Sequence, residues 1–162
     1  MQAAAITAIK PPRVAKRDAM LIFGLASAYH CDNKAGLPAQ WERFVPYLGT
    51  IENVAVPGAY GVICNADEAG NFDYICGVEV REFPVHPREF TRLRIPPQTY
   101  AVFMHEQHIS SIGATCNAIW NQALPESKYK PADGPWFEYY GENFDGRTGM
   151  GGVEIWIPIQ AQ

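Results

Sequence analysis

The chain has 162 residues, of which 48% are hydrophobic and 19% are charged. These values are typical of a single globular domain with a substantial core, and they exclude an intrinsically disordered protein. The formal net charge of −4 argues against a general binder of nucleic-acid backbones, which needs clustered Lys and Arg, and is compatible with a positively charged ligand.

The first half of the chain predicts a strand, a helix and two further strands. Residues 1–18 hold two consecutive prolines and indicate an extended lead-in. The apolar run at 19–29 is typical of a strand buried on both faces. Apolar residues recur at helical spacing over 38–49, and a proline inside this pattern should shorten the helix. The segments 60–64 and 72–80 flank polar turn residues and predict a hairpin.

The second half repeats this order. Residues 99–105 predict a strand, and 110–124 carry apolar side chains on one helical face, with a serine as N-cap and a proline as the stop. The aromatic segment 136–140 favours a short strand after turn residues. A polar, glycine-rich connection over 143–152 then leads to a last strand at 153–158.

The order strand, helix, strand, strand therefore occurs twice, over 19–80 and 90–159. Local similarity supports the duplication, since Gly77-Val-Glu-Val80 recurs as Gly152-Val-Glu-Ile155. We expect an α+β fold in one domain, residues 19–162, in which an antiparallel sheet carries two helices on one side and a ligand cleft on the other.

The segment Trp136-Phe-Glu-Tyr-Tyr140 is the most informative part of the sequence. A period of two places Trp136, Glu138 and Tyr140 on one face of the strand. A carboxylate between aromatic rings loses hydration and gains nothing from the ring faces. It therefore needs a cationic or hydrogen-bonding partner, which a ligand could supply. Alternatively, Phe137 and Tyr139 form the core stripe and Glu138 points into water. Two large rings on a wet face would form an exposed apolar patch, which favours a binding surface.

Further residues are expected to face the cleft. Tyr60 is the repeat equivalent of Trp136 under the alignment of Gly58-Ala-Tyr60 with Gly134-Pro-Trp136. If the Val and Ile faces of the last strands cover the helices, Glu79 and Trp156 point to the cleft. Glu154 alternates in the same way, although simple solvent exposure is the favoured expectation for it. The predicted ligand-binding residues are Glu138, Trp136, Tyr140, Glu79, Tyr60 and Trp156.

No metal, cofactor or targeting motif is found in the sequence. Four cysteines lack the paired short spacing of metal and redox sites and are expected to be reduced and buried. Cys64 and Cys76 flank the predicted hairpin and could face each other across it. The start of the chain lacks the basic segment of a secretory signal, and no run is long enough to span a membrane. We therefore expect a cytoplasmic protein without membrane contact.

Four segments together resemble the gyrase-inhibitor-like family of small-molecule-binding domains. They are the segment 136–140, Glu154-Ile-Trp-Ile-Pro-Ile159, Tyr100-Ala-Val-Phe-Met-His105 and Ile119-Trp-Asn-Gln-Ala-Leu-Pro125. This family includes the effector-binding domains of AraC-type and MerR-type multidrug-responsive activators. The resemblance, which extends from about Arg13, implies the duplicated fold and a central pocket for amphipathic, often cationic, aromatic compounds. It also implies a buried glutamate, which Glu138 matches by position.

The resemblance implies a small-molecule-binding protein for a lipophilic cation. The activators carry a helix-turn-helix module that the short lead-in cannot hold, so a stand-alone protein without direct DNA contact is expected. Catalysis is the alternative, because some family members open cyclopropane rings of natural products and a desolvated Glu138 or Glu79 could activate water. No Ser-His-Asp or Cys-His set is found, and binding is favoured over catalysis. A third possibility is a protein partner such as a topoisomerase.

Overall fold

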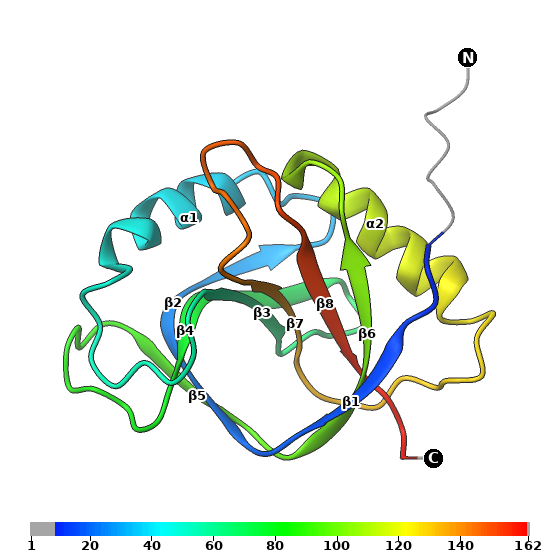
Figure 1. The fold of residues 1–162 in the computed structure, drawn as a ribbon, viewed down its shortest axis with the longest axis horizontal. Helices are drawn as coiled ribbons and strands as arrows, with labels where there is room; N and C mark the ends of the chain where they lie inside the picture. The colour runs from blue at the N-terminus through cyan, green and yellow to red at the C-terminus, as the bar shows by residue number, and fades with distance from the viewer. Residues whose placement is uncertain (1–8, 162) are drawn as a thin grey trace.

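The computed structural model describes residues 9–161, which form one eight-stranded antiparallel sheet and two short helices (Figure 1). The strands are β1 (Arg13–Arg17), β2 (Met20–His30), β3 (Ala59–Cys64), β4 (Asn71–Val80), β5 (Thr91–Ile95), β6 (Gln98–His105), β7 (Trp136–Tyr140) and β8 (Val153–Pro158). The helices are α1 (Leu37–Phe44) and α2 (Ile112–Ala118). The α+β class and the repeated element order are confirmed.

The sheet has the strand order β1-β6-β8-β7-β3-β4-β2-β5. The central pair, β7 and β3, joins the two halves, and β2-α1-β3-β4 corresponds to β6-α2-β7-β8. The leading strands are exchanged, because β1 precedes β2 but pairs with β6, whereas β5 precedes β6 but pairs with β2. Each half therefore completes the sheet of the other.

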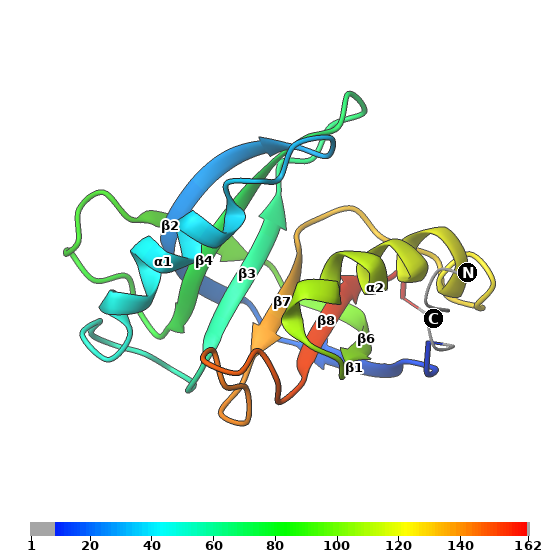
Figure 2. The same ribbon diagram turned by 90° about the horizontal axis from the view of Figure 1, so that it is seen from above.

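Both helices lie on one side of the sheet, α1 over β2 and β4 and α2 over β6 and β8 (Figure 2). Phe44 of α1 packs in a cluster with Phe23 and Val78, and Ile119 after α2 packs with Phe103 and Ile155. As the sequence predicted, α1 stops at a proline-containing 3₁₀ turn. A π-helical turn over Ile119–Ala123 extends α2.

The opposite face of the sheet is concave, because the sheet curls until β1 and β5 approach each other below β3 and β7 (Figure 1). One apolar cluster fills this face and contains Tyr60, Tyr100 and Phe137. An ion pair between Arg17 of β1 and Glu79 of β4 links strands that are far apart in the sheet order. The helix-free face is therefore largely a second core.

Three smaller expectations need correction. The edge strand β5 was not predicted, because its sequence Thr-Arg-Leu-Arg-Ile is short and charged. Cys64 and Cys76 cannot pair, since Cys64 points to the concave face and Cys76 to the helices, and both thiols are free. Cys31 is exposed and not buried.

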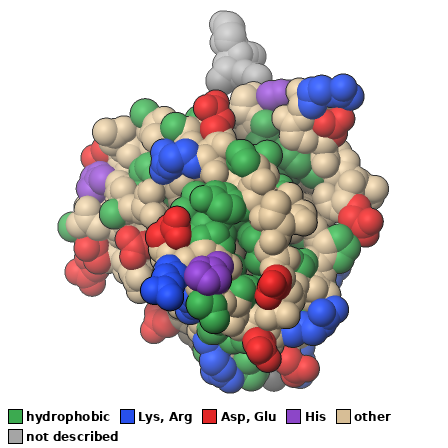
Figure 3. Space-filling view, turned by 90° about the vertical axis from the view of Figure 1, so that its left-hand side faces the viewer, with side chains coloured by type: hydrophobic (Ala, Val, Ile, Leu, Met, Phe, Trp, Pro, Cys, Tyr) green, Lys and Arg blue, Asp and Glu red, His purple; other side chains and the backbone are tan. Residues whose placement is uncertain are grey.

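The surface beyond the C-terminal end of α1 carries scattered apolar side chains. Val45 and Leu48 follow the helix, and Val85 lies in the β4–β5 loop with 65% of its surface exposed. Figure 3 shows this end of the molecule, where apolar side chains lie among acidic and basic ones. None of the helices formed by residues 9–161 has the length and apolar character needed to cross a bilayer.

Candidate functional site

Glu138 lies in the middle of β7, opposite Gly61 of β3, and is only 7% exposed. Its register partner on the other side is Ile155, which packs beneath α2. Side chains of register partners share a face, so Glu138 points toward the helices. The expectation that Glu138 faces the helix-free side is therefore wrong, and the side chain is buried on the helix side instead.

Two tyrosine hydroxyls hold the carboxylate. Tyr74 of β4 and Tyr140 of β7 each donate a hydrogen bond of 2.7 Å to Glu138 Oε1. No hydrogen bond to the second oxygen, Oε2, is made by any residue of the described range 9–161. The carboxylate is thus fixed through one oxygen and has a second oxygen left for another donor or a positive charge.

Burial sets the ionisation of these groups. Desolvation raises the pKa of Glu138, and the two tyrosine hydrogen bonds, together with the charge of Lys34, oppose this effect only in part. Desolvation and the nearby carboxylate raise the pKa of Tyr74 and Tyr140 well above the ordinary value. Both phenols therefore stay protonated and remain hydrogen-bond donors.

Gly61 makes the room that the carboxylate occupies. A Cβ atom at this position would lie 2.7 Å from Glu138 Oε1 and would also collide with the Tyr74 hydroxyl. A glycine inside a strand marks a place where another group approaches the backbone closely. Gly61 therefore belongs to the site, although it offers no side chain.

Aromatic rings surround the carboxylate on the helix side. Trp41 of α1 donates its indole N–H to the Tyr74 hydroxyl at 3.1 Å. The same ring meets Tyr140 edge-on, with centroids 5.1 Å apart, and Phe144 contacts Tyr140 at 5.0 Å. We call Glu138, Tyr74, Tyr140 and Trp41 the helix-side site.

Trp136 lies on the same face of β7, as the alternation predicted, but it packs toward the other helix. Its ring meets Trp120 edge-on at 5.6 Å. The buried indole nitrogen of Trp120 has no hydrogen-bond partner among residues 9–161. The three predicted residues of β7 are therefore side by side, with Trp41 and Trp120 as the aromatic neighbours that α1 and its counterpart supply.

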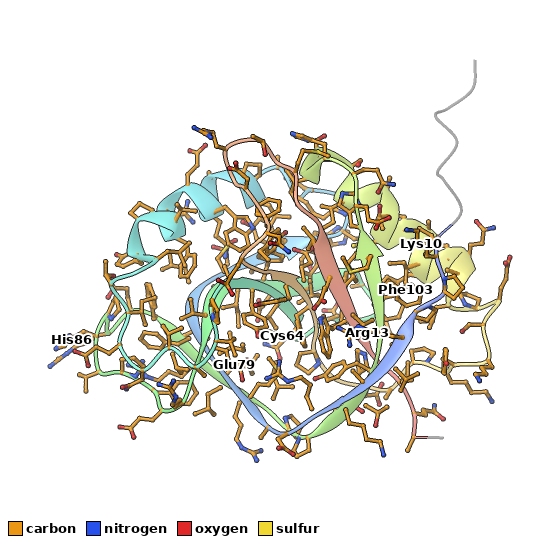
Figure 4. The ribbon with its side chains drawn as sticks, viewed as in Figure 1. Lys10, Arg13, Cys64, Glu79, His86 and Phe103 are labelled. Carbon is orange, nitrogen blue, oxygen red and sulfur yellow. The ribbon has the colours of Figure 1, made fainter. Side chains whose placement is uncertain are left out.

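The other three predicted residues, Tyr60, Glu79 and Trp156, lie on the concave face and do not join Glu138. The Tyr60 hydroxyl donates to Glu79 Oε1 at 2.8 Å, and Arg17 Nη2 donates to both Glu79 oxygens at 3.0 and 2.8 Å. Figure 4 shows Glu79 on the inner side of the curled sheet. The repeat alignment of Tyr60 with Trp136 is wrong, because they lie on opposite faces.

A small hollow of about 160 Å³ remains on the concave face. It is bordered by Tyr60, Phe137, Tyr139 and Trp156, with Arg17 and Glu154 at its polar edge. We call it the concave hollow. It lies on the face opposite the helix-side site, and Glu138 does not border it.

Sequence reasoning missed Tyr74 and Trp41. Tyr74 alternates with Ile75 in a run that indicates only a buried strand, and Trp41 belongs to the apolar face of a short helix. The placement of Val78 and Val80 toward the helices was predicted, and Tyr74 has the same parity along β4. The even spacing of Tyr74 from Val78 and Val80 could therefore have predicted that Tyr74 points toward the helices.

One group of possible metal ligands occurs in residues 9–161: His30, Cys31 and Asp32, whose ligand atoms lie within 4.8 Å of one another. Both ring nitrogens of His30 are already hydrogen-bonded, Nε2 with the Ala69 carbonyl at 2.7 Å and Nδ1 with the Asp32 backbone N–H at 3.0 Å. The group is better explained as a hydrogen-bonded turn.

Comparisons with known proteins identify the family of the chain. A model of the family described as "Integron-associated effector binding protein" matches residues 13–159. The chain belongs to this family. The transcriptional regulator BrlR of Pseudomonas aeruginosa is 36% identical over 121 residues, which are 74% of this chain and 44% of the regulator. The chain therefore spans less than half the length of that relative.

Solved structures of other proteins share the fold. SAV2435, solved with bound tetraphenylphosphonium, superposes with a TM-score of 0.76 at 15% identity, covering 94% of this chain and 95% of that one. An integron cassette protein from the mobile metagenome of Vibrio cholerae gives 0.68 at 20% identity, covering 94% and 97%. The resemblance to gyrase-inhibitor-like domains is confirmed, and the chain is a member of an effector-binding family.

Proposed function

We propose that the chain binds lipophilic organic cations, with Glu138 supplying the opposite charge. The observation that supports this proposal is the burial of a carboxylate without a cationic partner. None of the ion pairs formed by residues 9–161 involves Glu138, and its two hydrogen-bond donors are neutral hydroxyls. A cationic ligand would supply the charge that is lacking.

The energetics favour a ligand that is both cationic and apolar. Desolvation of an ion costs several kcal/mol, and neutral hydrogen bonds offset only part of that cost. Each ring among Trp41, Tyr74 and Tyr140 can add roughly 0.5 to 2 kcal/mol of cation–π attraction. Burial of the ligand's apolar surface would supply most of the affinity, and the carboxylate would supply selectivity for positive charge.

Access requires a local rearrangement at α1. Glu138 is 7% exposed, and Trp41 covers the two tyrosines that hold it. A bulky ligand reaches the carboxylate only if the Trp41 ring leaves this position and its hydrogen bond to Tyr74 breaks. The rest of α1 is anchored by the buried Phe44 and by Gln40, which donates to the carbonyls of Leu25 and Tyr74, so the rearrangement is confined to the Trp41 side chain.

Calorimetric titration with tetraphenylphosphonium tests the proposal, with neutral triphenylphosphine oxide as the comparison. SAV2435 binds tetraphenylphosphonium, which makes this cation a suitable probe. Removal of one partner of a buried charge pair costs about 2 to 5 kcal/mol, so Glu138→Gln should weaken the phosphonium about 30-fold or more and the neutral oxide less than about threefold.

The exposed Glu142 provides a matched control, because Glu142→Gln removes the same charge from a surface position four residues along the chain. This variant should retain the affinity of the parent. Equal weakening of the cation and the neutral compound by Glu138→Gln would contradict charge recognition, and a similar loss in Glu142→Gln would indicate only a long-range field.

The raised pKa of Glu138 supports hydrolysis as a second candidate. A carboxyl group that holds its proton closer to neutral pH is suited to general acid catalysis, and Tyr74 lies within hydrogen-bond distance of it. Glu138 would protonate the breaking ring carbon of an activated cyclopropane while water forms the new C–O bond and returns a proton to the carboxylate. Mass spectrometry of the compound after incubation would detect the added water, and Glu138→Gln should abolish that product.

A further inference from the structure

Two residues that border the concave hollow, Trp156 and Glu154, already bind a cation of the protein itself, the side chain of Arg13. The guanidinium group of Arg13 lies 5.2 Å from the centroid of the Trp156 ring, and its Nη2 lies 3.2 Å from Glu154 Oε2. An aromatic face and a carboxylate are the two groups that bind organic cations in proteins. Arg13 belongs to the edge strand β1 (Figure 4).

Trp156 and Glu154, the two residues that contact Arg13, are rigidly held. The Trp156 indole N–H donates to Glu154 Oε1 at 3.0 Å, which orients the carboxylate. Trp156 stacks on Phe137 with an interplanar angle of 13° and meets Tyr100 edge-on at 5.4 Å. A fixed ring and a fixed carboxylate lose little conformational entropy when a ligand binds.

Arg13, in contrast, is weakly held. Its side chain is 55% exposed and that of Glu154 is 28% exposed, and ion pairs of this kind contribute little to stability. Arg17, the other arginine near Trp156, is far better anchored, because it is 26% exposed and contacts both oxygens of Glu79. A ligand can therefore replace Arg13, whereas Arg17 is a fixed residue at the border of the hollow.

We propose that the concave hollow is a second binding site for small aryl amidinium or guanidinium cations, which replace Arg13 at Trp156 and Glu154. The hollow of about 160 Å³ is similar in size to an engineered cavity of about 150 Å³ that accommodates benzene. The aryl group would occupy the hollow, against the Phe137 and Tyr139 rings that border it, and the planar cation would face Glu154. This site is separate from Glu138, and the proposal does not depend on the function proposed above.

Benzamidine is the appropriate probe, and neutral, planar benzamide is its matched comparison. Binding is measured by titration while the indole N–H resonance of Trp156, assigned with Trp156→Phe, is followed by NMR. Arg13→Ala removes the competing cation and should bind benzamidine roughly two- to fivefold more tightly than the parent, the factor expected for an exposed ion pair. Glu154→Gln should weaken benzamidine roughly fivefold and leave benzamide unchanged.

Two further variants make the test decisive. Lys10→Ala removes a cation that pairs with Glu106 on the surface, away from the hollow, and should bind benzamidine like the parent. Glu138→Gln should leave the benzamidine-dependent movement of the Trp156 resonance unchanged, which separates this site from the helix-side site. The proposal is overturned if Arg13→Ala and Lys10→Ala bind benzamidine equally, if benzamide binds as tightly as benzamidine, or if the Trp156 resonance does not move.

Discussion

Substitution of Glu138 by Gln should change how the stability of the protein depends on pH. The carboxyl group has a raised pKa in the folded state because it is buried. The folded state therefore binds this proton more tightly than the unfolded state does. Its contribution to stability is fully present below the unfolded pKa of about 4.3 and is lost as the pH rises through the folded pKa.

The magnitude follows from linkage. Between the unfolded and folded pKa values of Glu138, the free energy of unfolding should fall by up to about 1.4 kcal/mol for each pH unit, and above the folded pKa it should level off. Glu138→Gln removes this contribution, and its amide oxygen can still accept hydrogen bonds from Tyr74 and Tyr140. The free energy of unfolding of the variant minus that of the parent should therefore increase with pH and then become constant.

Urea denaturation at a series of pH values from 4 to 9 measures this difference. Glu142→Gln is the control, because the exposed carboxylate at that position is not subject to the same burial. A difference between Glu138→Gln and the parent that is constant across this pH range, or that falls with rising pH, would refute the inference that burial controls the ionisation of Glu138. The same profile in both variants would refute it as well.

Three further substitutions test the packing around the two faces. Trp41→Ala should raise the association rate of tetraphenylphosphonium about fivefold in stopped-flow fluorescence, because about 1 kcal/mol of hydrogen bonding and ring contact no longer closes the helix-side site; an unchanged rate would show that Trp41 is not the barrier. Gly61→Ala should lower the free energy of unfolding by about 1 to 3 kcal/mol through overpacking. The control Gly113→Ala, which meets nothing within 4 Å, should raise it by about 0.5 to 1 kcal/mol; equal effects would contradict the close approach at Gly61. Arg17→Met should cost about 2 kcal/mol in urea denaturation, less than a fully buried pair because Arg17 is 26% exposed, and a loss below about 0.5 kcal/mol would show that its link to Glu79 is only incidental.

Element order was predictable because hydrophobic periodicity is a local property. The strand with Tyr60, the hairpin up to Val80 and the aromatic strand at 136–140 all occur where the sequence placed them. The boundaries of the two pseudo-repeats, 19–80 and 90–159, stay a prediction. The exchange of β1 and β5 between the halves was not predictable, since strand pairing across the chain leaves no local pattern.

The assignment of faces was the main difficulty. Alternation correctly grouped Trp136 with Glu138, but it could not show which face the helices cover. The alignment of Tyr60 with Trp136 was wrong by a shift in register, and a shift of one residue moves a side chain to the opposite face. Gly61, directly opposite Glu138, was a usable signal that a large group approaches that strand.

The exchange of β1 and β5 has a consequence for how the molecule is made on the ribosome. Because β1 joins the sheet only through β6, its backbone N–H and C=O groups find no partner strand until the second half has been synthesised. The first half also waits for β5 to cover the outer edge of β2 and for β7 to cover β3. Nascent chains therefore expose pairing edges during translation, and conditions that slow elongation between β4 and β6 should favour association with other chains.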